Sequence, residues 1–162
     1  MFSIGIITAS DKGARGERED LSGKAIAEVL AELGEVKHYL IVPDEQSALS
    51  EAMIQMADDL KLDLILTTGG TGLGPRDVTP EATLAVIDRQ VPGIPEVMRA
   101  KSLEKTSRAM LSRAVSGLRG RTLIINLPGS PKGVRECLEA VLPALDHGLS
   151  IMKGEAGECA RP

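Results

Sequence analysis

Residues 67–81 hold the residue types best suited to binding an anion. They read TTGGTGLGPRDVTPE, so four glycines and a carboxylate follow a short β-branched run. Glycines tolerate positive φ angles and let backbone N–H groups approach a ligand without side-chain obstruction. Thr67, Thr68 and Thr71 add hydroxyl donors. The segment is therefore a candidate cradle for phosphate.

The familiar nucleotide-binding motifs do not describe this loop. Gly69 and Gly74 have the outer spacing of a P-loop, but Pro75-Arg76 stands where Lys-Ser/Thr should follow. The run Gly70-Thr71-Gly72 lacks the third glycine of the dinucleotide fingerprint. A nucleotide here would be held in another way.

Asp77 is the carboxylate most suggestive of a cation. It follows the glycines and precedes the helix cap that we predict at Thr79. A carboxylate beside phosphate-binding amides would repel a nucleotide unless a cation lay between them, which favours a magnesium ligand. The alternative is an Asx-type turn stabilised by its own backbone. Arg76 could equally bind phosphate or pair with Asp77.

Two other polar loops leave more than one interpretation open. Asp44 stands at the N-cap position of a helix predicted for residues 45–60, so its residue type alone indicates a cap. Ser10 and Asp11 occupy a similar loop position, where a solvated turn would explain them equally well.

The segment Pro128-Gly129-Ser130-Pro131 predicts a helix start. Ser130 would be the cap and Pro131 the first-turn proline. A helix N-terminus preceded by glycine is also a ready anion site, and the two roles are compatible.

Alternating strand and helix patterns surround these loops. Strands are predicted at 3–8, 36–42, 62–67 and 122–127, with an edge strand at 112–118; helices are predicted at 22–34, 45–60, from 79, at 96–103 and from 131, the last bent at Pro143. This order predicts an α/β fold, a mostly parallel sheet covered by helices on both faces. The loops at 8–11, 43–44, 69–77 and 126–131 all follow strands, so they should converge at one sheet edge.

Length and composition bound the remaining possibilities. The chain has 162 residues, which suits a single domain, assigned here to 1–153 with a flexible tail at 154–162. Its net charge is −4, with both signs spread along the chain, and Phe2 and Tyr39 are its only aromatic residues. This composition is unlike that of a nucleic-acid binder.

The cysteines and the N-terminus indicate a cytoplasmic protein. Cys137 and Cys159 lie far apart and have no metal-site spacing, so they are interpreted as inert thiols in a reducing compartment. No basic leader and no apolar run of membrane-spanning length are present. His38 and His147 have no partner spacing and are interpreted as structural or exposed.

The motifs, taken in order, resemble the MogA/MoaB family of molybdenum cofactor biosynthesis, which includes the G domain of gephyrin. The resemblance covers residues 4 to about 145 and rests on the segments 10–12, 19–23, 42–45, 68–72, 76–83, 108–113 and 126–132. Within the family, the MogA branch is the most similar to this sequence. The family fold is a three-layer α/β/α sandwich.

The resemblance implies transfer of adenylate from ATP to molybdopterin, with Mg²⁺ as cofactor and release of pyrophosphate. It implies that Asp44 and Asp77 are catalytic and hold the metal, which replaces the cap interpretation of Asp44. It also implies a trimer, or a hexamer in MoaB-like members, and a downstream molybdenum insertase as partner. The expected binding residues are Thr8, Ser10, Asp11, Thr68, Gly69, Gly70, Thr71, Gly72, Asn126, Pro128, Gly129, Ser130 and Pro131.

Two other functions are compatible with the same family. One is a MoaB-type carrier that binds the pterin without turnover, and the presence of both aspartates argues against it. The other is a scaffold module, but the chain has no extra linker or partner-binding tail.

Overall fold

A six-stranded sheet forms the centre of the computed structural model, which describes residues 1–155. The strand order is β2-β1-β3-β6-β5-β4. The strands are β1 (Phe2–Ala9), β2 (Gly34–Val42), β3 (Leu64–Thr68), β4 (Arg89–Gln90), β5 (Ser116–Arg119) and β6 (Thr122–Leu127). The four strands β2, β1, β3 and β6 are parallel, whereas β5 is antiparallel to both of its neighbours.

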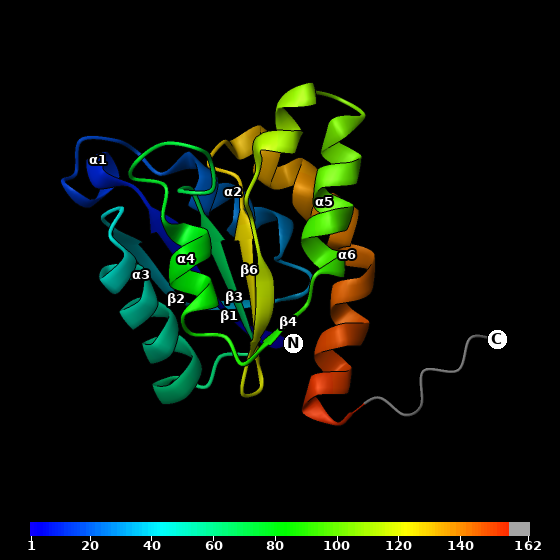
Figure 1. Cartoon of the computed structure of the whole chain (residues 1–162). Coiled ribbons are helices and arrows are strands. Elements are labelled where there is room, and N and C mark those ends of the chain that lie inside the picture. Colours follow the sequence, from blue (N-terminus) through cyan, green and yellow to red (C-terminus); the bar gives the residue numbers. More distant parts are fainter. Residues whose placement is uncertain (156–162) are drawn as a thin grey trace.

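Helices cover both faces of this sheet (Figure 1). They are α1 (Asp11–Ala14), α2 (Leu21–Val29), α3 (Gln46–Ile54), α4 (Thr79–Leu84), α5 (Gly93–Leu103) and α6 (Pro131–Lys153). Helices α2, α5 and α6 pack on one face, and α3 and α4 pack on the other. The prediction of a three-layer α/β fold with a mostly parallel sheet is confirmed.

The central strands are buried on both faces, which explains their continuous apolar sequences. In β1, Ile4 and Ile6 face α2 and α6, while Ile7 faces α3. In β3, Leu64 and Leu66 face the first layer and Ile65 the second. Side chains locked in this way fix the ends of β1 and β3, from which two of the candidate loops emerge.

The order of the strands creates a topological switch point between β1 and β3. The chain leaves β1 to form β2 on one side, then returns to form β3 on the other. Loops after two such strands diverge and leave a crevice at their carboxyl ends. The convergence of polar loops predicted from the sequence is found at this edge.

Three predicted element boundaries differ from the structure. The helix predicted for 45–60 ends at Ile54 and continues as a π-helical turn, Gln55–Asp59. Its N-cap is Glu45, so the interpretation of Asp44 as a cap is wrong. The N-cap of α4 is Val78, because the Thr79 hydroxyl donates instead to the Gly69 carbonyl at 2.9 Å.

The C-terminal half differs in two further places. The segment predicted as an edge strand at 112–118 contains β5, which is internal because β4 forms the edge. Helix α6 runs through Pro143 without restarting. Its apolar stripe, which includes Val141, Leu145 and Leu149, is buried against the sheet. That burial offsets the cost of about 3 kcal/mol that proline imposes inside a helix.

No helix within residues 1–155 is both long and apolar enough to cross a membrane. The predicted tail lies outside the described residues, apart from Gly154 and Glu155.

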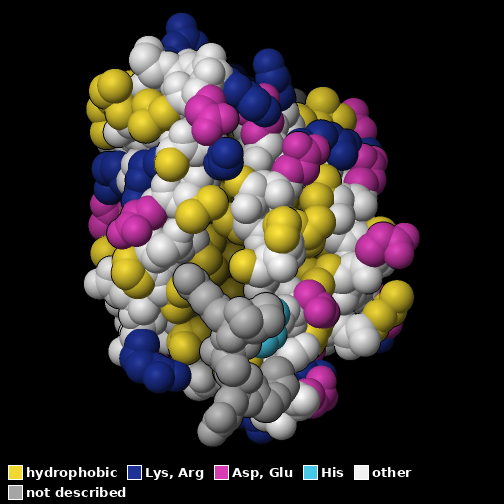
Figure 2. All heavy atoms as spheres, turned by 90° about the vertical axis from the view of Figure 1, so that its right-hand side faces the viewer, with side chains coloured by type: hydrophobic (Ala, Val, Ile, Leu, Met, Phe, Trp, Pro, Cys, Tyr) yellow, Lys and Arg dark blue, Asp and Glu magenta, His cyan; other side chains and the backbone are white. Residues whose placement is uncertain are grey.

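Seen from the side of α5 and α6, acidic and basic side chains are interspersed among apolar ones (Figure 2).

Candidate functional site

The glycine loop after β3 exposes backbone donors at the switch point. Gly69 and Gly70 have φ angles of +89° and +68°, which side-chain-bearing residues rarely adopt. A Cβ at Gly69 would lie 2.5 Å from the Ala9 carbonyl oxygen. The N–H groups of Gly70, Thr71 and Gly72 have no partner within residues 1–155. They are available to an anionic ligand.

The three threonines of this segment have different roles. Thr67 is buried and its hydroxyl accepts from the Asn126 side chain at 2.9 Å. Thr68 donates to the Pro128 carbonyl at 2.7 Å, which joins this loop to the one after β6. The Thr71 hydroxyl has no partner among the described residues, and Thr71 lines a cavity, so it is available to donate to a ligand.

Asp44 is held by the loop that follows β1. Its Oδ2 accepts the Asp11 N–H at 2.9 Å, and Asp11 Oδ1 accepts the Asp44 N–H at 3.0 Å. Oδ1 of Asp44 has no partner within residues 1–155. Burial raises the pKa of Asp44 above its usual value, and the charges of Asp11 and Asp77 add to this effect.

Asp77 folds back over its own loop. Its Oδ2 accepts the Gly74 N–H at 2.9 Å, and its N–H donates to the Gly74 carbonyl at 3.0 Å. Asp77 therefore stabilises a local turn, as one of its two predicted interpretations states. Oδ1 has no partner in the described chain, so one carboxylate oxygen is left for a ligand.

Two arginines whose partners the sequence patterns did not indicate, Arg76 within the loop and Arg113 outside it, tie the loop to its neighbours. Arg76 pairs with Asp11 through two hydrogen bonds of 2.7 and 2.9 Å, so neither of its predicted partners is the observed one. This ion pair lowers the pKa of Asp11. Arg113 donates from Nε to the Gly72 carbonyl at 2.7 Å and from Nη2 to the Asp77 carbonyl at 2.6 Å. Long-range side-chain pairings of this kind leave no local sequence signal.

Two cavities lie on either side of the glycine loop and the 128–131 segment. One, of about 410 Å³, is lined in part by Thr71, Gly72, Pro128 and Ser130. The other, of about 360 Å³, is lined in part by Thr8, Ser10, Thr68, Gly69, Gly129 and Pro131. Both volumes are in the range of small-molecule sites. Most of the predicted binding residues are thus brought to one edge of the sheet and divided between two spaces, whereas Asp11, Gly70 and Asn126 line neither cavity.

Asn126 lies beneath the site and lines neither cavity. It is fully buried, and its Nδ2 donates to the hydroxyls of Thr67 and Thr83, both at 2.9 Å. Its Oδ1 accepts the Val115 N–H at 3.2 Å. These hydrogen bonds give Asn126 a supporting role under the loops, and its contact with substrate stays a prediction.

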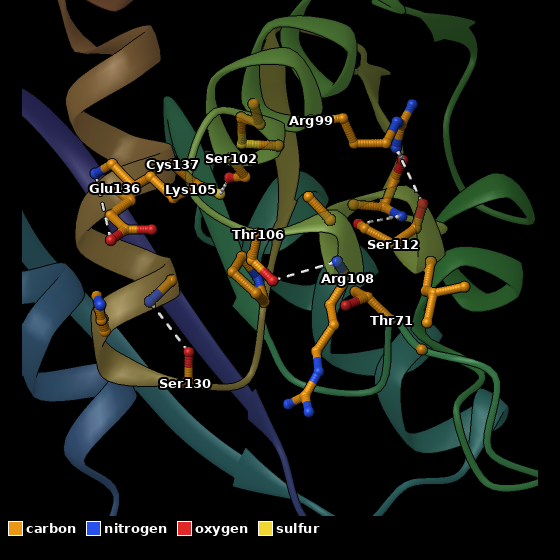
Figure 3. A pocket seen from close by; sticks show the side chains of 18 of the residues that line it. Thr71, Arg99, Ser102, Lys105, Thr106, Arg108, Ser112, Ser130, Glu136 and Cys137 are labelled. Carbon is orange, nitrogen blue, oxygen red and sulfur yellow. Dashed lines mark hydrogen bonds and ion pairs between the residues drawn. The ribbon is translucent and has the colours of Figure 1, made fainter.

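The larger cavity is lined by basic side chains that the sequence did not predict to meet there (Figure 3). Arg99 and Lys105 are engaged, Arg99 with the Ala114 carbonyl and Lys105 with Glu136. Arg108 and Lys132 have no side-chain partner within residues 1–155. The figure shows Arg108 extending into the open space of the cavity. The 108–113 and 126–132 motifs contained these two residues, but nothing in their spacing indicated convergence.

The smaller cavity is bordered by a hydrogen-bonded cluster around Asp20. Asp20 Oδ2 accepts from Thr8 Oγ1 at 2.5 Å and from the Tyr39 hydroxyl, and Oδ1 caps α2 at the Gly23 N–H. Since Thr8 is already engaged with Asp20, its hydroxyl is committed to the scaffold. The predicted donors Ser10 and Ser130 likewise cap α1 and α6 through the N–H groups of residues 13 and 133.

No cluster of three or more His, Cys, Asp or Glu side chains within residues 1–155 is arranged to hold a metal ion. Within the described part of the chain, Asp44 and Asp77 each keep one carboxylate oxygen without a protein partner. Magnesium is commonly held by one or two carboxylates together with substrate phosphates.

A sequence profile of the family described as "Probable molybdopterin binding domain" matches residues 5–147. The chain belongs to this family. The resemblance drawn from the motifs is thereby confirmed.

Relatives in this molybdopterin-binding family are similar over most of the chain. Molybdopterin adenylyltransferase of Helicobacter pylori strain J99 is 49% identical over 154 residues, which are 93% of this chain and 88% of that protein. The Escherichia coli K12 enzyme of the same name is 42% identical over 144 residues, 87% of this chain and 74% of that protein.

Solved structures of the family have the same fold. The molybdopterin biosynthesis enzyme MoaB from Thermus thermophilus superposes with a TM-score of 0.90 at 58% identity, covering 98% of this chain and 100% of that one. A structure of MogA superposes with a TM-score of 0.86 at 41% identity, covering 93% and 99%. The sequence predicts the MogA branch, and structural similarity does not distinguish that branch from MoaB.

Proposed function

We propose that this chain is a molybdopterin adenylyltransferase, which transfers AMP from ATP to molybdopterin and releases pyrophosphate. The observation that carries the proposal is the pair of cavities on either side of the glycine loop, with Asp44 and Asp77 beside it. The enzymes of that name in Helicobacter pylori and Escherichia coli support it.

The two cavities suit a reaction between two phosphate-bearing substrates. Each would hold the body of one substrate, and the phosphates would meet at the partition made by the glycine loop and the 128–131 segment. The free N–H groups of Gly70 to Gly72 would bind phosphate oxygens there. Arg108 and Lys132 add positive charge on the side of the larger cavity.

The reaction needs no protein nucleophile. An oxygen of the terminal phosphate of molybdopterin attacks the α-phosphorus of ATP, a new P–O bond forms, and the bond to the bridging oxygen of the β-phosphate breaks. Pyrophosphate leaves with that oxygen. The chain would contribute by holding both phosphates in line and stabilising the charge that develops on them.

The two aspartates fit a role as magnesium ligands. Each has an oxygen without a protein partner within residues 1–155, and, after burial, their mutual repulsion contributes to the raised pKa of Asp44. A divalent cation held by these carboxylates would relieve that repulsion. When bound, the cation would neutralise part of the phosphate charge. Asp44 and Asp77 would orient it.

We further propose that the protein is a cytoplasmic homotrimer whose product is consumed by a molybdenum insertase. Closed cyclic symmetry is the usual arrangement for soluble homo-oligomers. Analytical ultracentrifugation tests the assembly. A trimer mass is expected at micromolar concentration, and a monomer or a hexamer would contradict this assignment.

Pyrophosphate release tests the catalytic proposal. The protein mixed with ATP, molybdopterin and Mg²⁺ should release pyrophosphate, and omission of molybdopterin or Mg²⁺ should stop the release. Binding of molybdopterin without pyrophosphate above a protein-free control would contradict the proposal and indicate a carrier instead.

A further inference from the structure

The loop from Gly72 to Asp77 has few contacts apart from the ion pair that Arg76 forms with Asp11. Its internal hydrogen bonds are the two between Gly74 and Asp77. Leu73 at its tip is 67% exposed. Ordering a glycine-rich segment costs more backbone entropy than ordering other residues, so contacts from outside the loop must fix it.

One guanidinium makes contacts at both ends of this loop. Arg113 Nε donates to the Gly72 carbonyl at 2.7 Å, and Nη2 donates to the Asp77 carbonyl at 2.6 Å. The Arg113 backbone N–H also donates to the Thr71 carbonyl at 2.9 Å. These groups span the loop from its entry to its exit.

The third arm of the same guanidinium reaches α4. Arg113 Nη1 forms an ion pair with Glu81 in the first turn of that helix. The pair lowers the pKa of Glu81, so the carboxylate stays ionised at neutral pH. Helix α4 packs in the second core layer through Ala82, which makes it a firm anchor. Arg113 therefore connects the glycine-rich loop to a rigid element.

We propose that Arg113 is a positioning residue, which fixes the 72–77 loop and so determines where the Asp77 carboxylate lies. Arg113 lines neither cavity, so it acts through the loop rather than on a substrate. The role in catalysis rests on the proposed function, whereas the role in ordering the loop does not.

An arginine is required by the directions of the three acceptors. Its planar fork presents five N–H groups, and three of its nitrogens here serve two carbonyls and one carboxylate. A lysine has one ammonium at the end of a flexible chain and cannot reach both ends of the loop together. Arg113→Lys keeps the charge and removes this geometry.

Arg119 offers a matched control at the opposite end of the sheet. It forms two hydrogen bonds to Asp58, of 2.9 and 2.6 Å, and one of 2.7 Å to the Val86 carbonyl. Arg119→Lys therefore removes a comparable set of contacts remote from the glycine loop. Melting temperatures of both variants show whether they are folded.

Hydrogen–deuterium exchange of residues 72–78 is the first measurement, and it needs no activity. Arg113→Lys should speed exchange at the Gly74 and Asp77 amides, whereas Arg119→Lys should leave them as in the wild type. In pyrophosphate release, kcat of Arg113→Lys should fall about 100-fold with a much smaller change in KM for ATP, because a misplaced catalytic group costs about that much.

A second variant separates the carbonyl contacts from the ion pair. Glu81→Gln leaves both carbonyl contacts in place, and the glutamine oxygen can still accept from Arg113 Nη1, so the link to α4 survives without its charge and kcat should stay within about fivefold of the wild type, as for a partly exposed pair. Loop exchange in Arg113→Lys like that of the wild type would overturn the proposal, and so would a kcat equal to that of Arg119→Lys. A loss in Glu81→Gln as large as in Arg113→Lys would also overturn it.

Failure of the proposed function would be recognised separately. If the wild-type protein releases no pyrophosphate, the adenylyltransferase assignment is wrong. The exchange of residues 72–78 still decides whether Arg113 holds the loop.

Discussion

Asp11 and Asp44 each accept the backbone N–H of the other, at 3.0 and 2.9 Å. This reciprocal pair joins the turn after β1 to the turn after β2, the two strands on one side of the switch point. Oδ1 of Asp44 has no partner in the described chain and lies 3.4 Å from the position that a Cβ would take on Gly70. Asp44 is thus a fixed carboxylate facing the glycine loop.

Asp44→Asn should abolish adenylyl transfer while leaving the fold intact. The asparagine Oδ1 can still accept the Asp11 N–H, so the turn keeps its contact, but the negative charge is lost. Asp77→Asn should have the same effect. Turnover in both variants should fall at least about 100-fold, as for loss of a catalytic electrostatic contact, measured by pyrophosphate release.

The direction in which Asp44→Asn changes the stability of the fold follows from the pKa of Asp44. The folded-state pKa of Asp44 is raised, first by burial, so its ionisation opposes folding, and stability from this group is lost as pH rises. Asn removes that cost, and the melting temperature at neutral pH should stay equal or rise. Asp59→Asn, at an exposed residue on the π-helical turn, is the control and should retain turnover. Retained turnover in Asp44→Asn would return Asp44 to a structural role.

The fold is largely predictable from the sequence because its central strands β1, β3 and β6 are buried on both faces and mostly apolar. The Ser130-Pro131 helix start is also predicted correctly, since local chemistry decides it. Strand β5 is harder to place because only four residues, including Gly117, form it, and its pairing with β6 decides its position. The continuity of α6 through Pro143 depends on tertiary burial, which a proline in the sequence does not reveal.

Asn126→Ala should destabilise the protein by about 3 kcal/mol. Asn126 is fully buried and makes three side-chain hydrogen bonds, each of which contributes about 1 kcal/mol. Urea unfolding measures the loss. Under conditions where the variant is folded, KM for ATP should be unchanged, because Asn126 lines neither cavity. A destabilisation below about 1 kcal/mol would contradict this role.

Gly69→Ala should lose both stability and turnover. The φ angle of +89° and the approach of a Cβ to the Ala9 carbonyl at 2.5 Å make any side chain unfavourable, by at least about 1 kcal/mol. Gly93→Ala is the matched control, because its Cβ would meet nothing within 4 Å at the start of α5. Thermal unfolding should show Gly93→Ala equal to or more stable than the wild type. Equal stability of the two variants would contradict the requirement at Gly69.

Tyr39 should titrate anomalously. Burial, followed by its hydrogen bond to Asp20, raises its pKa from 10.0 to about 12. The folded state therefore holds the proton more tightly, and stability falls as pH rises from 10 to about 12. The chain has one tyrosine and no tryptophan, so near-ultraviolet tyrosinate absorbance reports this residue alone. Tyrosinate formation in the folded protein with a midpoint near 10 would contradict the contact.

The site is less predictable than the fold because its partners come from distant loops. The glycines and Asp77 are recognisable by type and spacing, whereas the family resemblance singles out Asp44. Arg76 binds Asp11, and Arg113 binds the glycine loop, across separations that no local pattern encodes. Thr8 and Thr68, two of the expected binding residues, line the smaller cavity, and their hydroxyls donate to Asp20 and to the Pro128 carbonyl, partners that the sequence did not indicate.

Adenylyl transfer is tested most directly by following the α-phosphorus of ATP. ATP labelled at that atom is incubated with the protein, molybdopterin and Mg²⁺, and the labelled products are separated. If AMP is transferred to molybdopterin, the label should move to the pterin, with one pyrophosphate formed for each labelled pterin. Label found only in free AMP, or remaining entirely in ATP while molybdopterin is bound, would contradict adenylyl transfer.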